Sequence, residues 1–313
     1  MIDKQLELVK VLGKGGSSKV FLAKDALNNK YAIKVIRKDK ASLQHSGDMV
    51  LKREHELLQQ LDGHPNIIKS LYVNYQGVLE SGNESESIMY LALEYARHGT
   101  LSSFIKHTGC LEEEVARFYA LQLWHAVWYL HSLGYAHLDI KLENVLLDDL
   151  FNIKLADMGS SIKVLETNGL TDRRRGTVMY MAPEVVSLKF NESFDAWAAD
   201  IYSLGVTLSL LMSGAFPSAD KLSMSTVDSD KTHTIHSDKS AKRYSHAFTE
   251  EAKMLIQSMM NSDPAKRPTM NEVLSSSWLC KEFSNNSMAE EVYNEMSWRS
   301  DYISNIQLQS EEY

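Results

Sequence analysis

The spacing of apolar residues changes near residue 111, and this change constrains the fold more than any other feature of the chain. Before it, short runs rich in Val, Ile, Leu and aromatic residues alternate with Gly, Asn and Asp turn signals, a pattern typical of β-strands. After it, apolar residues recur at helical spacing over long segments. The sequence therefore predicts an α+β protein in which a small β-rich part precedes a larger, mainly helical part.

The individual elements follow from the same patterns. Strands are predicted over 6–16, 18–26, 30–38, 67–75 and 88–96, and helices over 48–62, 111–134, 197–214 and 250–261. The polar stretch 79–87 (LESGNESES) is interpreted as a loop, and the Ser-rich stretch 218–247 as a loop or insertion. Most strands are thus placed in the first third of the chain.

Composition argues against several classes of function. Hydrophobic residues make up 44% and charged residues 24% of the 313 residues, which is typical of a globular protein. No run of eighteen apolar residues occurs and the charged start MIDKQLELVK lacks the apolar stretch of a signal peptide, so we expect a soluble, cytoplasmic protein with no membrane association, nuclear residence being left open. The net charge of −8 argues against nucleic-acid binding. Cys110 and Cys280 form no CxxC or Cys/His pattern, so neither a disulfide framework nor a zinc site is predicted.

Three features of the β-rich part are weak when taken singly. Gly13-Lys14-Gly15-Gly16 lies between two predicted strands, where glycines let backbone N–H groups approach an anion, but a plain glycine turn explains the same residues. Lys34 in the next strand could reach phosphates beneath such a loop or simply lie in solvent. Glu54, twenty residues further on, could pair with Lys34 or be a surface carboxylate.

The stretch HLDIKLEN (137–144) places three polar residues, Asp139, Lys141 and Asn144, within a run of Leu and Ile. Together with GKGGSSKV, YAIK, ADMG (156–159) and MAPE (181–184), it completes an ordered set of motifs. This set resembles that of the eukaryotic protein kinase family, over about residues 8–282.

Two further residues support the resemblance. Asp200 is similar to the family's buried aspartate of the lower lobe, and Arg267 to the arginine that pairs with the glutamate of the APE motif, here Glu184. The resemblance implies a bilobal fold with an N-terminal lobe (1–93), a hinge and C-terminal lobe (94–282) and an acidic tail (283–313).

The resemblance also implies ATP and Mg²⁺ as cofactors and a role for each polar residue. Asp139 would accept the proton of the substrate hydroxyl, and Lys141 would lie near the transferring phosphate. Asn144 and Asp157 would hold Mg²⁺. Lys34 would contact the α- and β-phosphates, with Glu54 orienting it. The expected nucleotide-binding residues are Leu12, Gly13, Lys14, Gly15, Gly16, Val20, Ala32, Lys34, Leu93, Glu94, Ala96 and Leu146.

Lys141 and Thr177 follow the pattern of the serine/threonine branch, so protein substrates bearing Ser or Thr are expected. Similarity to calmodulin-dependent and checkpoint-type kinases is weak. Two alternatives come from other classes. One is a pseudokinase that binds nucleotide and acts as an allosteric scaffold. The other is a small-molecule or lipid kinase on a related fold, which is disfavoured because such kinases usually lack the APE segment with its Thr177 neighbour. An active enzyme is favoured because six key polar residues are all present: Lys34, Glu54, Asp139, Lys141, Asn144 and Asp157. A kinase-like chain that no longer catalyses phosphate transfer is expected to lose one or more of them.

The chain departs from the family pattern at four positions. Ser18 replaces the third glycine and Met158 the Phe of DFG, and both changes are interpreted as mild. Leu138 replaces the Arg of HRD, which normally neutralises a phosphate on the activation segment, so we predict that activity depends little on phosphorylation there. Leu142 replaces a proline, and no functional interpretation of it follows.

The tail, 283–313, carries six acids against one base. It also has apolar residues at near-helical spacing: Met288, Val292, Met296, Ile303 and Ile306. The sequence is compatible with a helix packed on the larger lobe, with a partly disordered extension, and with an element that occupies a regulatory or docking surface. It does not indicate an oligomeric state.

Overall fold

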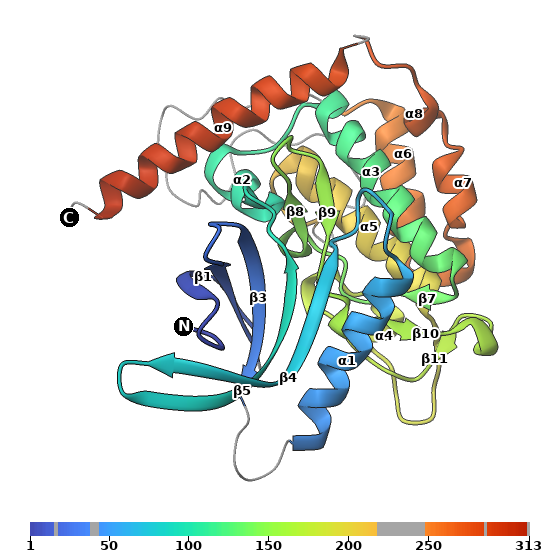
Figure 1. The fold of residues 1–313 in the computed structure, drawn as a ribbon. Helices are drawn as coiled ribbons and strands as arrows, with labels where there is room; N and C mark the ends of the chain where they lie inside the picture. Colours follow the sequence, from blue (N-terminus) through green and yellow to red (C-terminus); the bar gives the residue numbers. More distant parts are fainter. Residues whose placement is uncertain (16–17, 38–43, 218–247, 285–286, 312–313) are drawn as a thin grey trace.

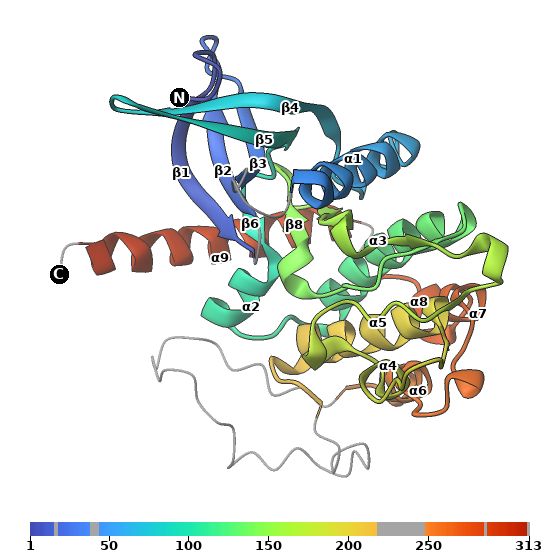
Figure 2. The same ribbon diagram turned by 90° about the horizontal axis from the view of Figure 1, so that it is seen from below.

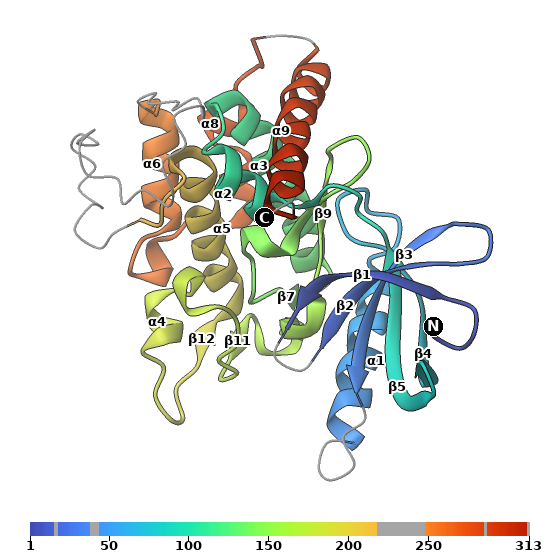
Figure 3. The same ribbon diagram turned by 90° about the vertical axis from the view of Figure 1, so that its left-hand side faces the viewer.

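The computed structural model describes residues 1–15, 18–37, 44–217, 248–284 and 287–311. Gly16 and the loop or insertion predicted at 218–247 lie outside the described residues. Figure 1 and Figure 3 present a β-rich lobe beside a larger helical lobe, which confirms the predicted α+β, two-lobe architecture.

The smaller lobe is built on a five-stranded antiparallel sheet with strand order β1-β2-β3-β5-β4. The strands are β1 (Glu7–Lys14), β2 (Lys19–Lys24), β3 (Lys30–Arg37), β4 (Ser70–Ser81) and β5 (Glu84–Glu94). Alternate residues of β3 face opposite sides: Ile33 and Val35 pack with Ile2 and Leu6 of the N-terminus, whereas Ala32 joins the main core. Helix α1 (Gln44–Gln60) covers that second side of the sheet (Figure 2).

The loop predicted at 79–87 was wrong, because these residues extend β4 and β5 into a long hairpin. Ser81 pairs with Glu84 around a two-residue turn in which Gly82 adopts a positive φ of 59°. Most side chains of this hairpin lie at least partly in solvent, and its sequence is therefore polar. It lacks the run of apolar residues from which strands were predicted.

The larger lobe is mainly helical. Its α-helices up to the tail are α2 (Leu101–Thr108), α3 (Glu113–Ser132), α4 (Pro183–Val186), α5 (Ala196–Ser213), α6 (Glu250–Met259), α7 (Met270–Leu274) and α8 (Ser277–Cys280). Its short strands are β6 (Gly99–Thr100), β7 (Tyr135–Ala136), β8 (Val145–Leu147), β9 (Ile153–Leu155), β10 (Ile162–Lys163), β11 (Leu170–Thr171) and β12 (Phe194–Asp195).

Helix α5 forms the centre of this lobe. Asp195 caps its N-terminus by accepting hydrogen bonds from the backbone of Trp197 and Ala198, and Gly214 ends it with a positive φ of 69°. It is the one described helix that is apolar and long enough to span a membrane, and 78% of the window that qualifies is buried inside the protein. Its apolar character therefore matches a core position.

The tail residues form helix α9 (Met288–Glu311), which lies beside α2 (Figure 1 and Figure 2). One face of α9 is buried, with Met288, Val292, Met296 and Ile303 all at or below 8% exposure. These residues recur at the spacing of one helical face and join the core of the larger lobe.

Candidate active site

A lysine, a glutamate and an aspartate from three separate segments meet between the lobes. Lys34 of β3 lies with its Nζ 2.9 and 2.7 Å from the two carboxylate oxygens of Glu54 on α1, and 2.7 Å from Asp157 Oδ1. Lys34 and Glu54 are buried, whereas the side chain of Asp157 keeps 46% of its surface exposed. Asp157 can therefore contact a ligand while Lys34 and Glu54 hold their geometry.

The charges of this cluster shift the ionisation of each member. Burial lowers the pKa of Lys34, but the charges of Glu54 and Asp157 outweigh it, and the net pKa lies above its usual value. Burial raises the pKa of Asp157, but Lys34 outweighs it and the net pKa is lowered. For Glu54, burial dominates over the charge of Lys34 and raises the pKa. Lys34 is thus held as a cation and Asp157 as an anion at neutral pH.

A second polar cluster joins the loop that follows β7 to Thr177, which lies in the segment before α4. Lys141 Nζ lies 2.7 Å from Asp139 Oδ2 and 2.7 Å from Thr177 Oγ1, and the Thr177 hydroxyl donates to Asp139 Oδ1 at 2.8 Å. Asn144 donates from Nδ2 to the backbone carbonyl of Asp139 at 2.8 Å. Each polar residue of HLDIKLEN therefore has partners, which explains how it is tolerated among Leu and Ile.

Asn144 and Asp157 are brought together by the backbone. The amide of Ala156, the residue before Asp157, donates to the carbonyl of Asn144 at 2.9 Å. The side chains offer amide and carboxylate oxygens, the hard ligands that Mg²⁺ prefers. The chemistry of this pair therefore fits a magnesium ion. Among the described residues there is no group of three or more His, Cys, Asp or Glu side chains arranged to hold a metal by themselves.

Asp200 fixes the backbone of the loop that carries HLDIKLEN (137–144), called the catalytic loop after the family resemblance. Its fully buried carboxylate accepts hydrogen bonds from the amides of His137 at 2.7 Å and Leu138 at 2.8 Å. His131 Nε2 of α3 lies 2.9 Å from the same group. Leu138 has a positive φ of 63°, an uncommon conformation for a branched residue, and these bonds hold it there. The role of His131 was missed in the sequence, where no short motif marks it.

The residues predicted to surround adenine lie at the junction of the lobes. Ala32 pairs with Leu93 across β3 and β5, and both are buried together with Ala96. Val20 and Leu146 are partly buried and pack against the same core. Glu94 is the last residue of β5 and Ala96 comes two residues after it, at the connection to the larger lobe where a hinge is expected.

The glycine-rich loop is described only in part. Leu12, Gly13 and Lys14 belong to β1, and the amide of Gly15 donates to the carbonyl of Ser18 at 2.8 Å. This bond links the two described ends of the connection between β1 and β2.

The activation segment, residues 157–184, is anchored at several points by contacts of its own residues. Its β10 pairs with β7, and its β11 pairs with β12, where Leu170 lies opposite Asp195. The guanidinium of Arg175 donates to the carbonyl of Gly159 at 3.2 Å and so joins the end of the segment to its beginning. Glu184 forms a bidentate ion pair with buried Arg267, both oxygens lying 2.7 Å from guanidinium nitrogens.

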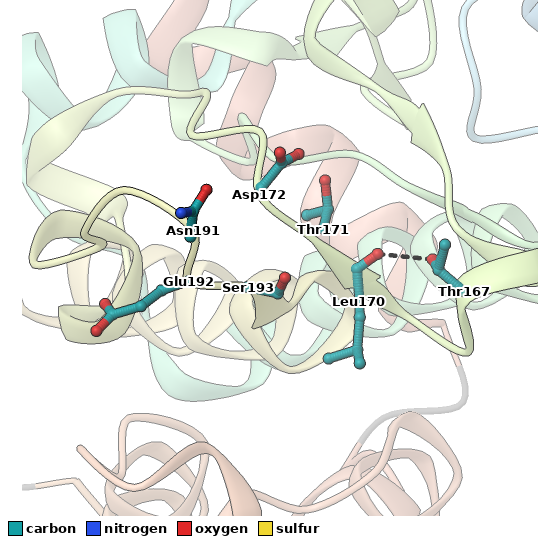
Figure 4. A pocket seen from close by; sticks show the side chains of 7 residues that line it. All are labelled: Thr167, Leu170, Thr171, Asp172, Asn191, Glu192 and Ser193. Carbon is teal, nitrogen blue, oxygen red and sulfur yellow. Dashed lines mark hydrogen bonds between the residues drawn. The ribbon is translucent and has the colours of Figure 1, made fainter.

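A surface depression lies beside this segment, and Figure 4 presents the residues that line it: Thr167, Leu170, Thr171, Asp172, Asn191, Glu192 and Ser193. Thr167 donates a hydrogen bond of 2.6 Å to the carbonyl of Leu170 at its edge. None of the predicted site residues lines this depression, so it is separate from the two polar clusters.

Three of the four positions that depart from the family pattern are accommodated by packing. Leu138 is 7% exposed and belongs to an apolar cluster that includes Ile162, Val164 and Ala182 of the activation segment. Met158 is 2% exposed and lies in the main core, where it accepts a weak hydrogen bond from Ser161 Oγ at 3.6 Å. Leu142 is likewise part of the main core.

Comparison with known proteins agrees with this geometry. The model of the protein kinase domain family matches residues 6–279, so the chain belongs to the protein kinase family. The chain is 34% identical over 288 residues to CBL-interacting serine/threonine-protein kinase 12 of Arabidopsis thaliana, covering 90% of this chain and 54% of that protein. It is 34% identical over 280 residues to CBL-interacting protein kinase 3 of Oryza sativa subsp. japonica, covering 88% and 58%. The chain thus spans about half the length of these curated relatives.

Proposed function

We propose that this chain is a serine/threonine protein kinase that transfers the γ-phosphoryl group of Mg-ATP to protein substrates. The observation that carries the proposal is the triangle of Asp139, Lys141 and Thr177, in which all three side chains lie 2.7–2.8 Å from one another. It is supported by the ion pair of Lys34 with Glu54, which family members need in place for transfer.

Each residue has a role that follows from its position. Asp139 Oδ accepts the proton of the substrate hydroxyl. The hydroxyl oxygen of the substrate forms a bond to the γ-phosphorus, and the bond between that phosphorus and the β-phosphate oxygen breaks, which releases ADP. Lys141, held 2.7 Å from Asp139, places a positive charge beside the transferring group. Lys34 binds the α- and β-phosphates and Glu54 orients it. Mg²⁺, held by Asn144 and Asp157, would neutralise charge on the phosphates.

The experiment is phosphate transfer from labelled ATP by the purified chain to a degenerate Ser/Thr/Tyr peptide library. Asp139→Asn keeps the size of the side chain but removes the proton acceptor, and a parallel reaction contains no Mg²⁺. We expect incorporation into Ser or Thr that disappears in both controls.

Two other outcomes would contradict the proposal. Incorporation that persists in Asp139→Asn would exclude the assigned base. Absence of incorporation with intact Mg-ATP binding would favour the nucleotide-binding scaffold.

A further inference from the structure

The turn between β8 and β9 contains a strained aromatic residue. Phe151 is 2% exposed and has a positive φ of 59°, a conformation that bulky residues keep only when their surroundings hold them in it. Its ring stacks on His98 with centroids 3.9 Å apart, and it meets the edges of Phe104 at 6.2 Å and Tyr293 at 5.5 Å. Tyr293 belongs to α9, so this helix helps to hold the turn.

His98 connects three parts of the molecule. It follows the hinge by two residues, and its amide donates to the carbonyl of Leu147 in β8 at 3.1 Å. Leu147 is adjacent to Leu146, the predicted floor of the adenine site. The His98 ring nitrogen Nδ1 forms a hydrogen bond of 3.2 Å with Ser300 Oγ of α9. A displacement of α9 would therefore be felt by the hinge and by β8 together.

Arg299 fixes α9 in this position. It is 1% exposed, and its guanidinium donates to Thr108 Oγ1 at 2.6 Å and to the carbonyls of Gly109 at 3.1 Å and Cys110 at 3.0 Å. A buried charge with this many partners tolerates little movement. Tyr293 and Ser300 are two helical turns apart and so share one face of α9, which Arg299 keeps turned toward Phe151 and His98.

We propose that α9 braces the predicted adenine site, with Tyr293 and Ser300 as positioning residues that act through Phe151 and His98. The inference rests on the proposed function in that Mg-ATP is the ligand of this site. It goes beyond the family match, which ends at residue 279, before α9 begins. It also predicts the sign of the effect of the tail. Loss of these contacts weakens nucleotide binding and does not increase the rate of phosphate transfer.

The test uses the full chain and point variants. Ser300→Ala removes one hydroxyl, Tyr293→Ser removes the ring that meets Phe151, and Tyr293→Phe keeps that ring. Trp298→Ala is the matched control, because Trp298 is on the same helix but 52% exposed and stacked on Tyr302. The measurements are the Kd of Mg-ATP by calorimetry, KM for ATP and for peptide, kcat, and amide exchange of residues 94–98.

We expect Ser300→Ala and Tyr293→Ser each to raise the Kd and the KM for ATP by about three- to tenfold, the effect of losing one modest contact. The KM for peptide and kcat stay unchanged, exchange at 94–98 becomes faster, and Tyr293→Phe and Trp298→Ala behave like the parent chain. A lowered melting temperature with an unchanged Kd, or equal weakening by Trp298→Ala, would overturn the inference.

The calorimetric Kd separates this inference from the proposed function. If the parent chain binds Mg-ATP but transfers no phosphate, the kinase proposal fails while the variants still decide the role of α9. If the parent chain does not bind Mg-ATP, both fail.

Discussion

Gly176 of the activation segment lies so close to the catalytic loop that a Cβ at this position would stand 2.2 Å from the carbonyl oxygen of Leu138. Its φ of +104° is also one that only glycine adopts readily. The residue therefore allows Thr177, its neighbour, to reach Asp139. The motif prediction named Thr177 but missed Gly176, although a glycine directly before that threonine was the available signal.

Gly176→Ala should lower kcat by about tenfold or more, because the backbone must move away from Leu138 and take Thr177 with it. Gly63→Ala is the matched control: its φ of +96° gives similar backbone strain, but a Cβ there meets nothing within 4 Å. We expect the control to lose stability but keep its kcat. Peptide kinetics and thermal unfolding distinguish the two, and equal kcat for both variants would contradict the close contact.

Thr177→Val should reduce kcat by about a hundredfold or more, since it removes hydrogen bonds to two charged groups, each worth about 1.5–3 kcal/mol. Thr177→Ser keeps the hydroxyl and should retain most of the rate. The Kd of Mg-ATP should not change in either variant, because Thr177 contacts Asp139 and Lys141 of the catalytic loop and is not among the predicted nucleotide-binding residues. Equal rates for the Val and Ser variants would exclude a role for this hydroxyl.

Removal of phosphate from the activation segment should change the rate by no more than about twofold, because Leu138 offers no charge for a phosphate to pair with. Apolar packing with Ile162, Val164 and Ala182 takes the place of that pair. The measurement compares phosphatase-treated chain with chain phosphorylated on Ser160, Ser161, Thr167 or Thr171. A large gain in rate on phosphorylation would refute the prediction.

Mg-ATP affinity should fall as the pH is lowered from 8 to 5. Burial raises the pKa of Glu54 above its usual value, so the folded protein protonates this carboxyl at a higher pH than the unfolded chain does. The contribution of Glu54 to folding stability is accordingly more favourable at low pH. Protonation at low pH, however, removes the negative charge with which Glu54 orients Lys34. Calorimetry at several pH values should give a steeper dependence for the parent chain than for Glu54→Gln, and parallel curves would contradict the assignment.

Arg267→Ala should lower the free energy of unfolding by about 3–5 kcal/mol, because it leaves the carboxylate of Glu184 without its bidentate partner. Lys266→Ala, next to it, removes an ion pair to Asp263 whose lysine side chain is 70% exposed, and should cost no more than about 0.5 kcal/mol. Denaturant unfolding of both variants checks the difference. Similar losses would mean that the buried pair is not the cause.

Local motifs predicted much of the fold and of the candidate site, because strands, helices and the catalytic loop carry their signals within a few residues. Lys34, Glu54 and Asp157 lie together although they are far apart in the sequence. The residues alone offered the Lys34–Glu54 pair as one of two alternatives, and only the family resemblance added Asp157. The contacts that were missed join distant segments through side chains with no motif of their own. Arg175 on the Gly159 carbonyl and Ser300 beside His98 are of this kind.

The single carboxylate of Asp200 has a consequence for how activity is lost. It joins the buried helix α5, the backbone of the catalytic loop and His131 of α3 in one set of hydrogen bonds. A chain whose larger lobe is folded but whose catalytic loop is detached would remove the two backbone amide donors from this buried carboxylate, a state of high free energy. Denaturation of the lobe and inactivation of the loop are therefore one cooperative event.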